Sequence, residues 1–281
     1  MVWSRLTRGM WIAVWLGIVL AGSVLDSRAS GLVIAPTRVM FEGRSRVATV
    51  YLTNRGNTTS TYRILLKDKR MLETGQIVDL EGDLRGEHPA SELVRFSPRR
   101  VVLEPGASQT IRLMLRNLSE ENLEKGEYRT HLVFQSVPDV VENDERMIAH
   151  AILETTIPVI IRRDNPAAEI KFGTVAMDTA TTLDGRPQLQ LTLERSGLRS
   201  VYGDLTVEWI VDGRPTLLTK LAGLAVYYPT LHRTMSIPLT LPNKAVLDRG
   251  HLAIRFEETA LGLGDLWADT SLDLVAEETE E

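Results

Sequence analysis

Apolar residues recur at every second position along much of this chain, and this period constrains the fold more than any other feature. In residues 46–54, Val50 and Leu52 belong to an apolar set that alternates with a second set of side chains. The same spacing recurs in residues 111–116 and 128–135. Side chains of a β-strand point to opposite faces in turn, so a period of two predicts strands.

Turn signals separate these short runs, and together they predict an all-β sandwich fold. Each signal supplies the restricted or left-handed backbone that a turn needs. The clearest signals are Gly56-Asn57, Pro105-Gly106, Asp184-Gly185 and Asp212-Gly213. The second half of the chain also reads as strands, which we expect at residues 189–193, 205–210, 235–241, 251–256 and 271–275.

Three segments depart from the simple pattern. Pro36 interrupts the apolar stretch 32–41, and because proline cannot donate to a ladder, this strand should be an edge that bends or changes sheet there. Residues 119–125 have the capping pattern of one short loop helix, which begins with Ser119 and is followed by Gly126. The acidic tail at residues 277–281 is expected to be solvated.

The chain has 281 residues, which suits one large or two ordinary domains. The polar segment 162–166 interrupts the strand pattern between two halves of similar size. We therefore predict two sandwich domains, at residues 30–163 and 164–281, joined by a short elbow.

The N-terminus has the pattern of a secretory signal. Arg5 and Arg8 precede an apolar run at residues 11–25, and small residues follow around Arg28. The run is shorter than the roughly 20 residues that a membrane-spanning helix needs, so a cleaved signal at residues 1–29 is favoured over a retained anchor. No later stretch reaches spanning length, and we expect the mature protein to be exported without stable membrane insertion.

Composition excludes several classes of function. The chain has no cysteine, which rules out disulfides, thiolate catalysis and cysteine-based metal sites. Its net charge of -5 offers no broad basic surface for nucleic acid. Its five histidines are scattered without ligand-like spacing, and neither a nucleophile elbow nor a phosphate loop is present. The sequence therefore predicts a protein that is not an enzyme and uses no metal or cofactor.

An ordered set of motifs gives a more specific indication. These motifs span essentially the whole mature chain and comprise residues 35–43, 48–54, 96–98, 103–106, 111–113, 126–129, 195–197, 200–204 and 226–227. In order and spacing they resemble the PapD-like periplasmic chaperones of the chaperone–usher pilus pathway. The resemblance is closer in the first half of the chain than in the second.

This resemblance implies two immunoglobulin-like sandwiches with a cleft between them, in which a pilus, fimbrial or related surface-fibre subunit docks. The last strand of the first domain would complete the subunit's own sandwich, a mode of strand addition known for chaperones and pilins. Basic residues in the cleft would hold the subunit's C-terminal carboxylate. An outer-membrane usher would then receive the subunit, and no cofactor takes part.

Arg38 matches the arginine that grips the carboxylate in this family, a task that suits the fork of donors on a guanidinium. Many relatives have a lysine as the second anchor, but the aligned residue here is Pro158. Arg162 is our candidate to replace that lysine. Arg162 and the adjacent Arg163 could instead pair with Asp164 or cap the elbow.

The matching donor strand is residues 147–161, after a polar loop around residues 142–146. Its odd-numbered side chains form the more apolar face, which either projects into the subunit or covers the chaperone's own core. The donor residues predicted on that face are Met147, Ala149, Ala151, Leu153, Thr155 and Ile157. The two alanines are small, so the fit to the groove should be shallow.

Two other functions compete with this prediction. The first is a secreted immunoglobulin-like adhesion module that binds a carbohydrate or protein through its loops. The second, an exported hydrolase built on a sandwich, has no catalytic motif to support it.

Overall fold

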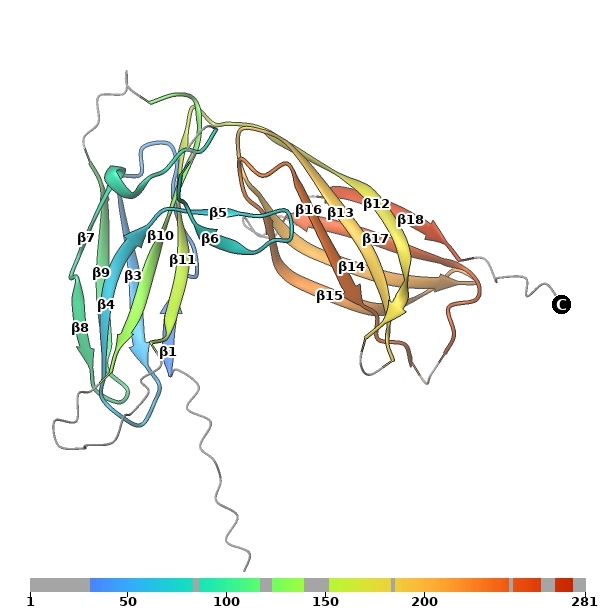
Figure 1. Ribbon diagram of the computed structural model, residues 1–281, viewed down its shortest axis with the longest axis horizontal. Coiled ribbons are helices and arrows are strands. Elements are labelled where there is room, and N and C mark those ends of the chain that lie inside the picture. The colour runs from blue at the N-terminus through green and yellow to red at the C-terminus, as the bar shows by residue number, and fades with distance from the viewer. Residues whose placement is uncertain are drawn as a thin grey trace, which may run out of the picture. The chain divides into compact units, whose positions relative to one another are not determined.

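The computed structural model describes residues 31–82, 86–116, 123–138, 152–182, 185–242, 245–258 and 266–274. Within these ranges the regular structure is β-strand, apart from short 3-10 turns such as η1 (Ser91–Leu93) (Figure 1). The predicted signal segment, the loop at residues 142–146 and the acidic tail lie outside the described residues. The predicted helix at 119–125 is described only at residues 123–125, which are not helical.

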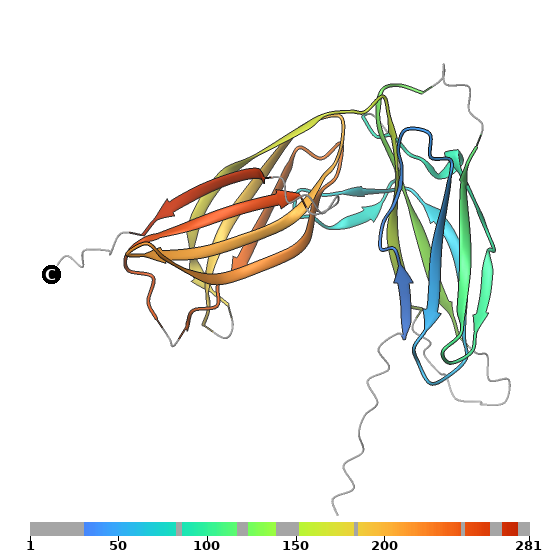
Figure 2. The ribbon, with the colours of Figure 1, turned by 180° about the vertical axis from the view of Figure 1, so that it is seen from behind.

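Strands up to residue 163 form the first sandwich, from a four-stranded and a five-stranded sheet (Figures 1 and 2). The first sheet has the order β1 (Leu32–Ala35), β3 (Val47–Asn54), β9 (Ser108–Leu115) and β7 (Val94–Ser97). The second sheet has the order β2 (Val39–Phe41), β11 (Glu154–Arg163), β10 (Gly126–Val137), β4 (Ser60–Lys67) and β8 (Arg100–Leu103). A separate hairpin consists of β5 (Lys69–Met71) and β6 (Ile77–Asp79).

The core of this sandwich confirms the alternation predicted from the sequence. Val50 and Leu52 of β3 and Ile111 and Leu113 of β9 are fully buried between the two sheets. Strand β10 differs, because both of its faces are buried from residue 126 to residue 134. Its polar residues therefore do not face solvent, and they reappear below as part of the candidate site.

Strands after residue 167 form the second sandwich, from sheets of three and four strands. The three-stranded sheet has the order β12 (Ala168–Thr181), β13 (Pro187–Gly197) and β16 (His232–Pro238). The four-stranded sheet has the order β15 (Arg214–Val226), β14 (Val201–Val211), β17 (His251–Glu258) and β18 (Leu266–Asp273). Both sandwiches are immunoglobulin-like, as the sequence predicts.

Two long strands of the second sandwich, β12 and β15, escaped prediction because bulges break their period of two. The register of β12 shifts between Phe172 and Val175, and that of β15 shifts opposite Val207 and Glu208. A bulge inserts one residue into one strand and so moves every later side chain to the other face. Strand ends also differ from the expected ones, since β16 spans His232–Pro238 rather than residues 235–241.

The change of sheet predicted at Pro36 is confirmed. β1, before the proline, pairs with β3 in the first sheet, and β2, after it, pairs in parallel with β11 in the second. Both segments are edges of their sheets. The chain thus contributes a short strand to each sheet, and the second one covers only part of β11.

Turn chemistry is also confirmed where the structure describes it. Asp212 and Gly213 both have positive φ, at 51° and 74°, and form the two-residue turn between β14 and β15. At the predicted elbow, Asp164 and Asn165 have φ of 56° and 43°. The last strand of the first sandwich ends at Arg163, the residue at which we predict the domain boundary.

Candidate functional site

The second sheet of the first sandwich has an open edge at the start of β11. β10 pairs with β11 from Glu154 to Arg163, but β2 covers the other side only at Val159–Ile161. No strand in the described part of the chain pairs with that other side at residues 154–158. An unpaired edge of this kind is a template for a strand from another chain.

The hydrogen bonds of β11 show which residues face the open edge. Ser136 donates its backbone N–H to the carbonyl of Leu153 at 2.9 Å, so these two residues form a hydrogen-bonded pair. Pairs of this type alternate along an antiparallel ladder, which turns the backbone groups of Thr155 towards β10 and those of Glu154 and Thr156 away from it. The backbone of Pro158 points away from β10, like that of Glu154 and Thr156, but proline has no N–H to offer at the open edge.

The predicted donor face divides at this edge into an exposed and a buried part. The side chain of Leu153 is 50% exposed, and Thr155 is exposed too. Ile157 is only 3% exposed and packs in the core of its own sandwich. Ile157 therefore covers the core of its own sandwich, the second of the two readings of this face. Met147, Ala149 and Ala151 lie outside the described residues.

Arg38 lies at the end of the open edge. In the parallel register Val39 pairs with Val159, so Arg38 immediately precedes the point at which β2 takes over from the open edge. Its guanidinium carbon is 3.4 Å from the centroid of the Tyr202 ring, on β14 of the second sandwich. Among the described residues, no hydrogen bond or ion pair engages the Arg38 donors, which leaves them available to an anion.

The other predicted cations already have partners. Arg162 donates through Nε to Glu127 at 3.1 Å and forms an ion pair with Glu42. Arg163 pairs with Asp164 at 3.4 Å, one of the alternatives that the sequence left open. Arg162 thus holds two carboxylates of its own chain, whereas the Arg38 guanidinium has no such partner among the described residues.

A polar face of β10, formed by Glu127, Arg129 and His131, is buried, which the sequence pattern does not predict. The Glu127 carboxylate is 1% exposed, accepts the N–H of Ser200 at 3.1 Å and also accepts the Ser200 hydroxyl. Arg129 donates to the carbonyls of Tyr228 at 2.7 Å and Lys69 at 3.2 Å. Burial lowers the pKa of Arg129.

Removing the Glu127 carboxylate should strongly destabilise the protein. Glu127→Ala leaves the guanidinium of Arg162 without its buried partner, and breaking such a pair costs about 3–5 kcal/mol. The double variant Glu127→Leu/Arg162→Met should recover the part of the loss that comes from the unpaired guanidinium, while the two donors of Ser200 stay without their acceptor. Urea unfolding of both variants measures the difference, and equal stability of the two would contradict a buried ion pair.

His131 should make the protein less stable in acid. Burial, with Arg129 and Lys69 adding and Asp79 opposing, lowers the pKa of His131 to about 3. Between the unfolded pKa near 6.5 and that value the unfolded chain binds the extra proton, so stability present at neutral pH is lost as the pH falls. The free energy of unfolding should drop by about 2 kcal/mol from pH 7 to pH 5 through this group.

Urea titrations of wild type and His131→Gln test this expectation. The variant should lose that part of the pH dependence, whereas the matched change at the exposed His232, His232→Gln, should keep it. A slope unchanged in His131→Gln would show that His131 does not become protonated on unfolding in this range.

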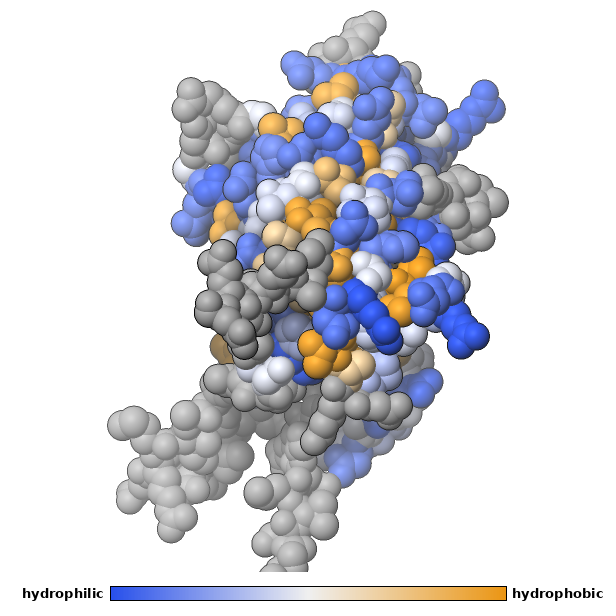
Figure 3. All heavy atoms as spheres, turned by 90° about the vertical axis from the view of Figure 1, so that its right-hand side faces the viewer, coloured by the Kyte–Doolittle hydropathy of each residue, from blue (hydrophilic) through white to orange (hydrophobic). Residues whose placement is uncertain are grey.

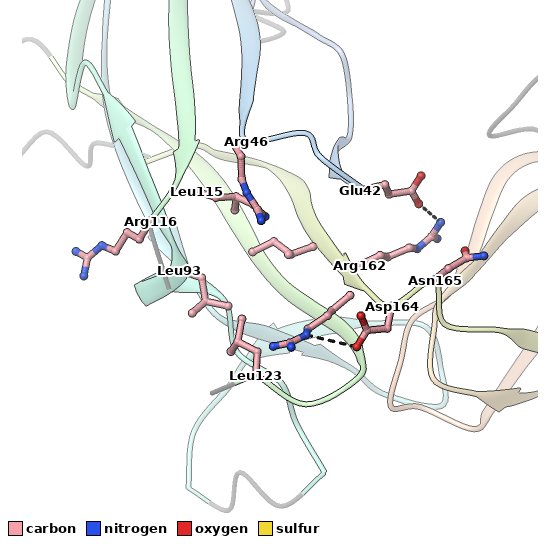
Figure 4. Close-up of a pocket in the computed structure, with 12 residues that line it drawn as sticks. Glu42, Arg46, Leu93, Leu115, Arg116, Leu123, Arg162, Asp164 and Asn165 are labelled. Atoms are coloured by element: carbon pink, nitrogen blue, oxygen red, sulfur yellow. Dashed lines mark hydrogen bonds and ion pairs between the residues drawn. The ribbon is translucent and has the colours of Figure 1, made fainter. Parts of the chain in front are cut away.

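A cavity of about 570 Å³ lies at the opposite end of β11 from the open edge (Figure 4). Leu93, Leu115, Leu123 and Ile161 form its apolar lining. The charged groups around it include the Arg163–Asp164 and Arg162–Glu42 pairs, which Figure 4 shows. The lining also includes Arg46 and Arg116, so four arginines surround the cavity against the two carboxylates of Glu42 and Asp164.

The face drawn in Figure 3 carries apolar residues scattered among charged ones. Scattered apolar residues are normal on a protein surface and do not mark a docking face. Among the described residues there is no cluster of three or more potential metal ligands. The same ranges contain no helix that is long and apolar enough to cross a membrane.

Comparisons with known proteins give similar structures only. No protein-family model matches the sequence, and no curated protein does. The YadV chaperone is 14% identical, with a TM-score of 0.45 over 87% of this chain and 100% of its own. The Pseudomonas aeruginosa CupB2 chaperone is 16% identical, with a TM-score of 0.42 over 86% and 100%.

A third structure is the chaperone–tip adhesion subunit complex CsuC–CsuE of the archaic chaperone–usher Csu pili of Acinetobacter baumannii. Its matching chain is 13% identical, with a TM-score of 0.44 over 88% of this chain and 99% of its own. The class 5 fimbriae chaperone CfaA is also similar, at 11% identity and a TM-score of 0.39 over 87% of this chain and 99% of its own.

Proposed function

We propose that this protein is a periplasmic assembly chaperone that binds subunits of a pilus or related surface fibre. It lends the open edge of β11 to a subunit whose own sandwich lacks a strand, and Arg38 holds the subunit's C-terminal carboxylate. An outer-membrane usher then receives the subunit. The family resemblance of the sequence and the predicted export signal support this proposal.

The observation that carries the proposal is a guanidinium with free donors at the end of an unpaired strand edge. β2 runs parallel to β11 and begins beside Arg38. A guest strand can pair with residues 154–157 of β11 in the position that β2 leaves empty. If it runs parallel to β11, as β2 does, its C-terminus lies beside Arg38. Both a backbone template and an anion site are then in register for a C-terminal strand.

The side chains along the open edge suit this partner. Leu153 and Thr155 lie on the same face as the core residue Ile157 but are exposed, so a guest sandwich can bury them. Burial of a leucine side chain contributes about 1.5–3 kcal/mol. We extend the donor face to Met147, Ala149 and Ala151, as the sequence predicts, and keep Arg162 as the second candidate anchor.

Periplasmic co-expression with candidate surface-fibre subunits, followed by purification and size-exclusion chromatography, tests the function. We expect a one-to-one complex with a subunit that has its native C-terminus, and none with a subunit extended by a few residues there. If no subunit forms a complex while a carbohydrate or protein ligand binds independently of Arg38, the protein is an adhesion module.

A further inference from the structure

The Tyr202 ring supports Arg38 from one side. A distance of 3.4 Å between the guanidinium carbon and the ring centroid places the cation directly over the ring. A cation over an aromatic face is attracted by the ring quadrupole. The N–H donors of a guanidinium lie in its own plane, so contact through one face leaves the fork at its edge available.

The ring itself is held firmly within the second sandwich. Its hydroxyl lies over Gly223, where an added Cβ would be 2.6 Å from the oxygen. The Tyr202 carbonyl accepts a hydrogen bond from the Trp267 indole at 3.3 Å. On the neighbouring strand β15, Tyr202 pairs with the buried Ala225. Tyr202 therefore has little freedom to move away from Arg38.

Tyr202 also packs against a small core that both sandwiches build. Buried Met71 and Ile160 come from the first sandwich, and Ala225 and Tyr227 come from the second. The hairpin of β5 and β6 joins this core, since the Thr230 hydroxyl donates to the carbonyl of Met71 at 2.7 Å. The position of the ring is thus fixed with respect to β2 and β11 as well.

From these contacts we infer that Tyr202 is a positioning residue for the carboxylate anchor. It fixes the Arg38 guanidinium before the guest arrives, so that less side-chain freedom is lost on binding. The inference rests on the proposed function and deepens it: the preferred ligand is a polypeptide's free C-terminal carboxylate, and its site needs a residue from each sandwich.

A pair of peptide probes tests the inference. Each is a fluorescein-labelled ten-residue peptide of alternating valine and threonine, one with a free C-terminal carboxylate and one with a C-terminal amide. Fluorescence anisotropy should show that wild type binds the acid about tenfold or more tightly than the amide, as expected for hydrogen bonds to a charged group. Tyr202→Leu should reduce that ratio by about two- to fivefold.

Two sets of controls separate positioning from a general loss of structure. Tyr202→Phe keeps the ring and should keep the acid-to-amide ratio. Gly223→Ala pushes on the ring hydroxyl and should lower the ratio. Gly213→Ala introduces a methyl group at a similar φ, 74° against 71°, with nothing within 4 Å, and should leave the ratio unchanged.

A second measurement needs no peptide. In NMR spectra of wild type, the Arg38 side-chain protons should be shifted upfield by the Tyr202 ring, and Tyr202→Leu should abolish that shift. A ratio near one in wild type overturns the carboxylate anchor and with it this part of the proposed function. A large ratio that persists in Tyr202→Leu and Gly223→Ala overturns only the role of Tyr202.

Discussion

Arg38→Gln is expected to weaken binding of a fibre subunit by about tenfold to a hundredfold, because hydrogen bonds to a charged group contribute roughly 1.5–3 kcal/mol. Glutamine retains polarity and much of the length but loses the charge and most of the donors. Arg38→Lys should lie between the variant and wild type, since a lysine keeps the charge but cannot form the bidentate fork. Affinity for a purified subunit, measured by calorimetry, gives all three values.

The fold should tolerate these changes. Within the described residues Arg38 makes no hydrogen bond or ion pair, and only its contact with Tyr202 is lost. Arg112 is exposed on the other sheet of the same sandwich, so Arg112→Gln is the matched control and should bind normally. Wild-type affinity in Arg38→Gln would remove Arg38 from the site and leave Arg162 as the remaining candidate anchor.

The sequence predicted those parts of the fold that local chemistry determines. The period of two places Val50 and Leu52 in the core, Pro36 marks the change of sheet, and Asp212-Gly213 forms the turn between β14 and β15. Each feature depends on neighbouring residues only. Strands β12 and β15 were missed because a bulge changes the period without leaving a motif.

The candidate site shows where such reasoning ends. Leu153, which directly precedes β11, and Ile157 within it have side chains of the same parity and look alike in the sequence, yet one is exposed and the other buried. Ile157 packs into the core of the first sandwich and Leu153 lies outside that core. The extent of the open edge is set separately by β2, more than a hundred residues earlier, which pairs with β11 only from Val159 onward. Alternation gives the face of a strand, but the extent of an open edge depends on pairing between distant segments.

The buried polar face of β10 has the same origin. Glu127 and Arg129 alternate with apolar residues and so resemble a solvated face. Their partners Ser200 and Tyr228 lie far along the chain in the second sandwich. Buried polar groups are almost always hydrogen-bonded, but the sequence does not reveal which distant groups satisfy them.

Thr156→Pro should strongly weaken subunit binding while leaving the protein folded. The N–H of Thr156 points to the open edge, where a guest strand would accept it, so Thr156→Pro removes a donor and places a ring against the guest backbone. An acceptor left unsatisfied costs about 1–3 kcal/mol, and steric exclusion adds to this, so affinity should fall by at least about tenfold. Thr156→Val keeps the N–H and should bind as wild type does.

The neighbouring position distinguishes strand addition from a contact made by side chains alone. The N–H of Thr155 faces β10, so Thr155→Pro removes a bond within the sandwich and should lower the thermal unfolding midpoint. Thr156→Pro should leave that midpoint nearly unchanged, because proline is tolerated at strand positions whose N–H would face solvent. Pro158 already occupies such a position two residues later in β11. If Thr156→Pro still binds the subunit with wild-type affinity, the guest does not pair with this edge. A guest held by Arg38 alone would then bind through its terminus, and its affinity would not depend on the β11 backbone.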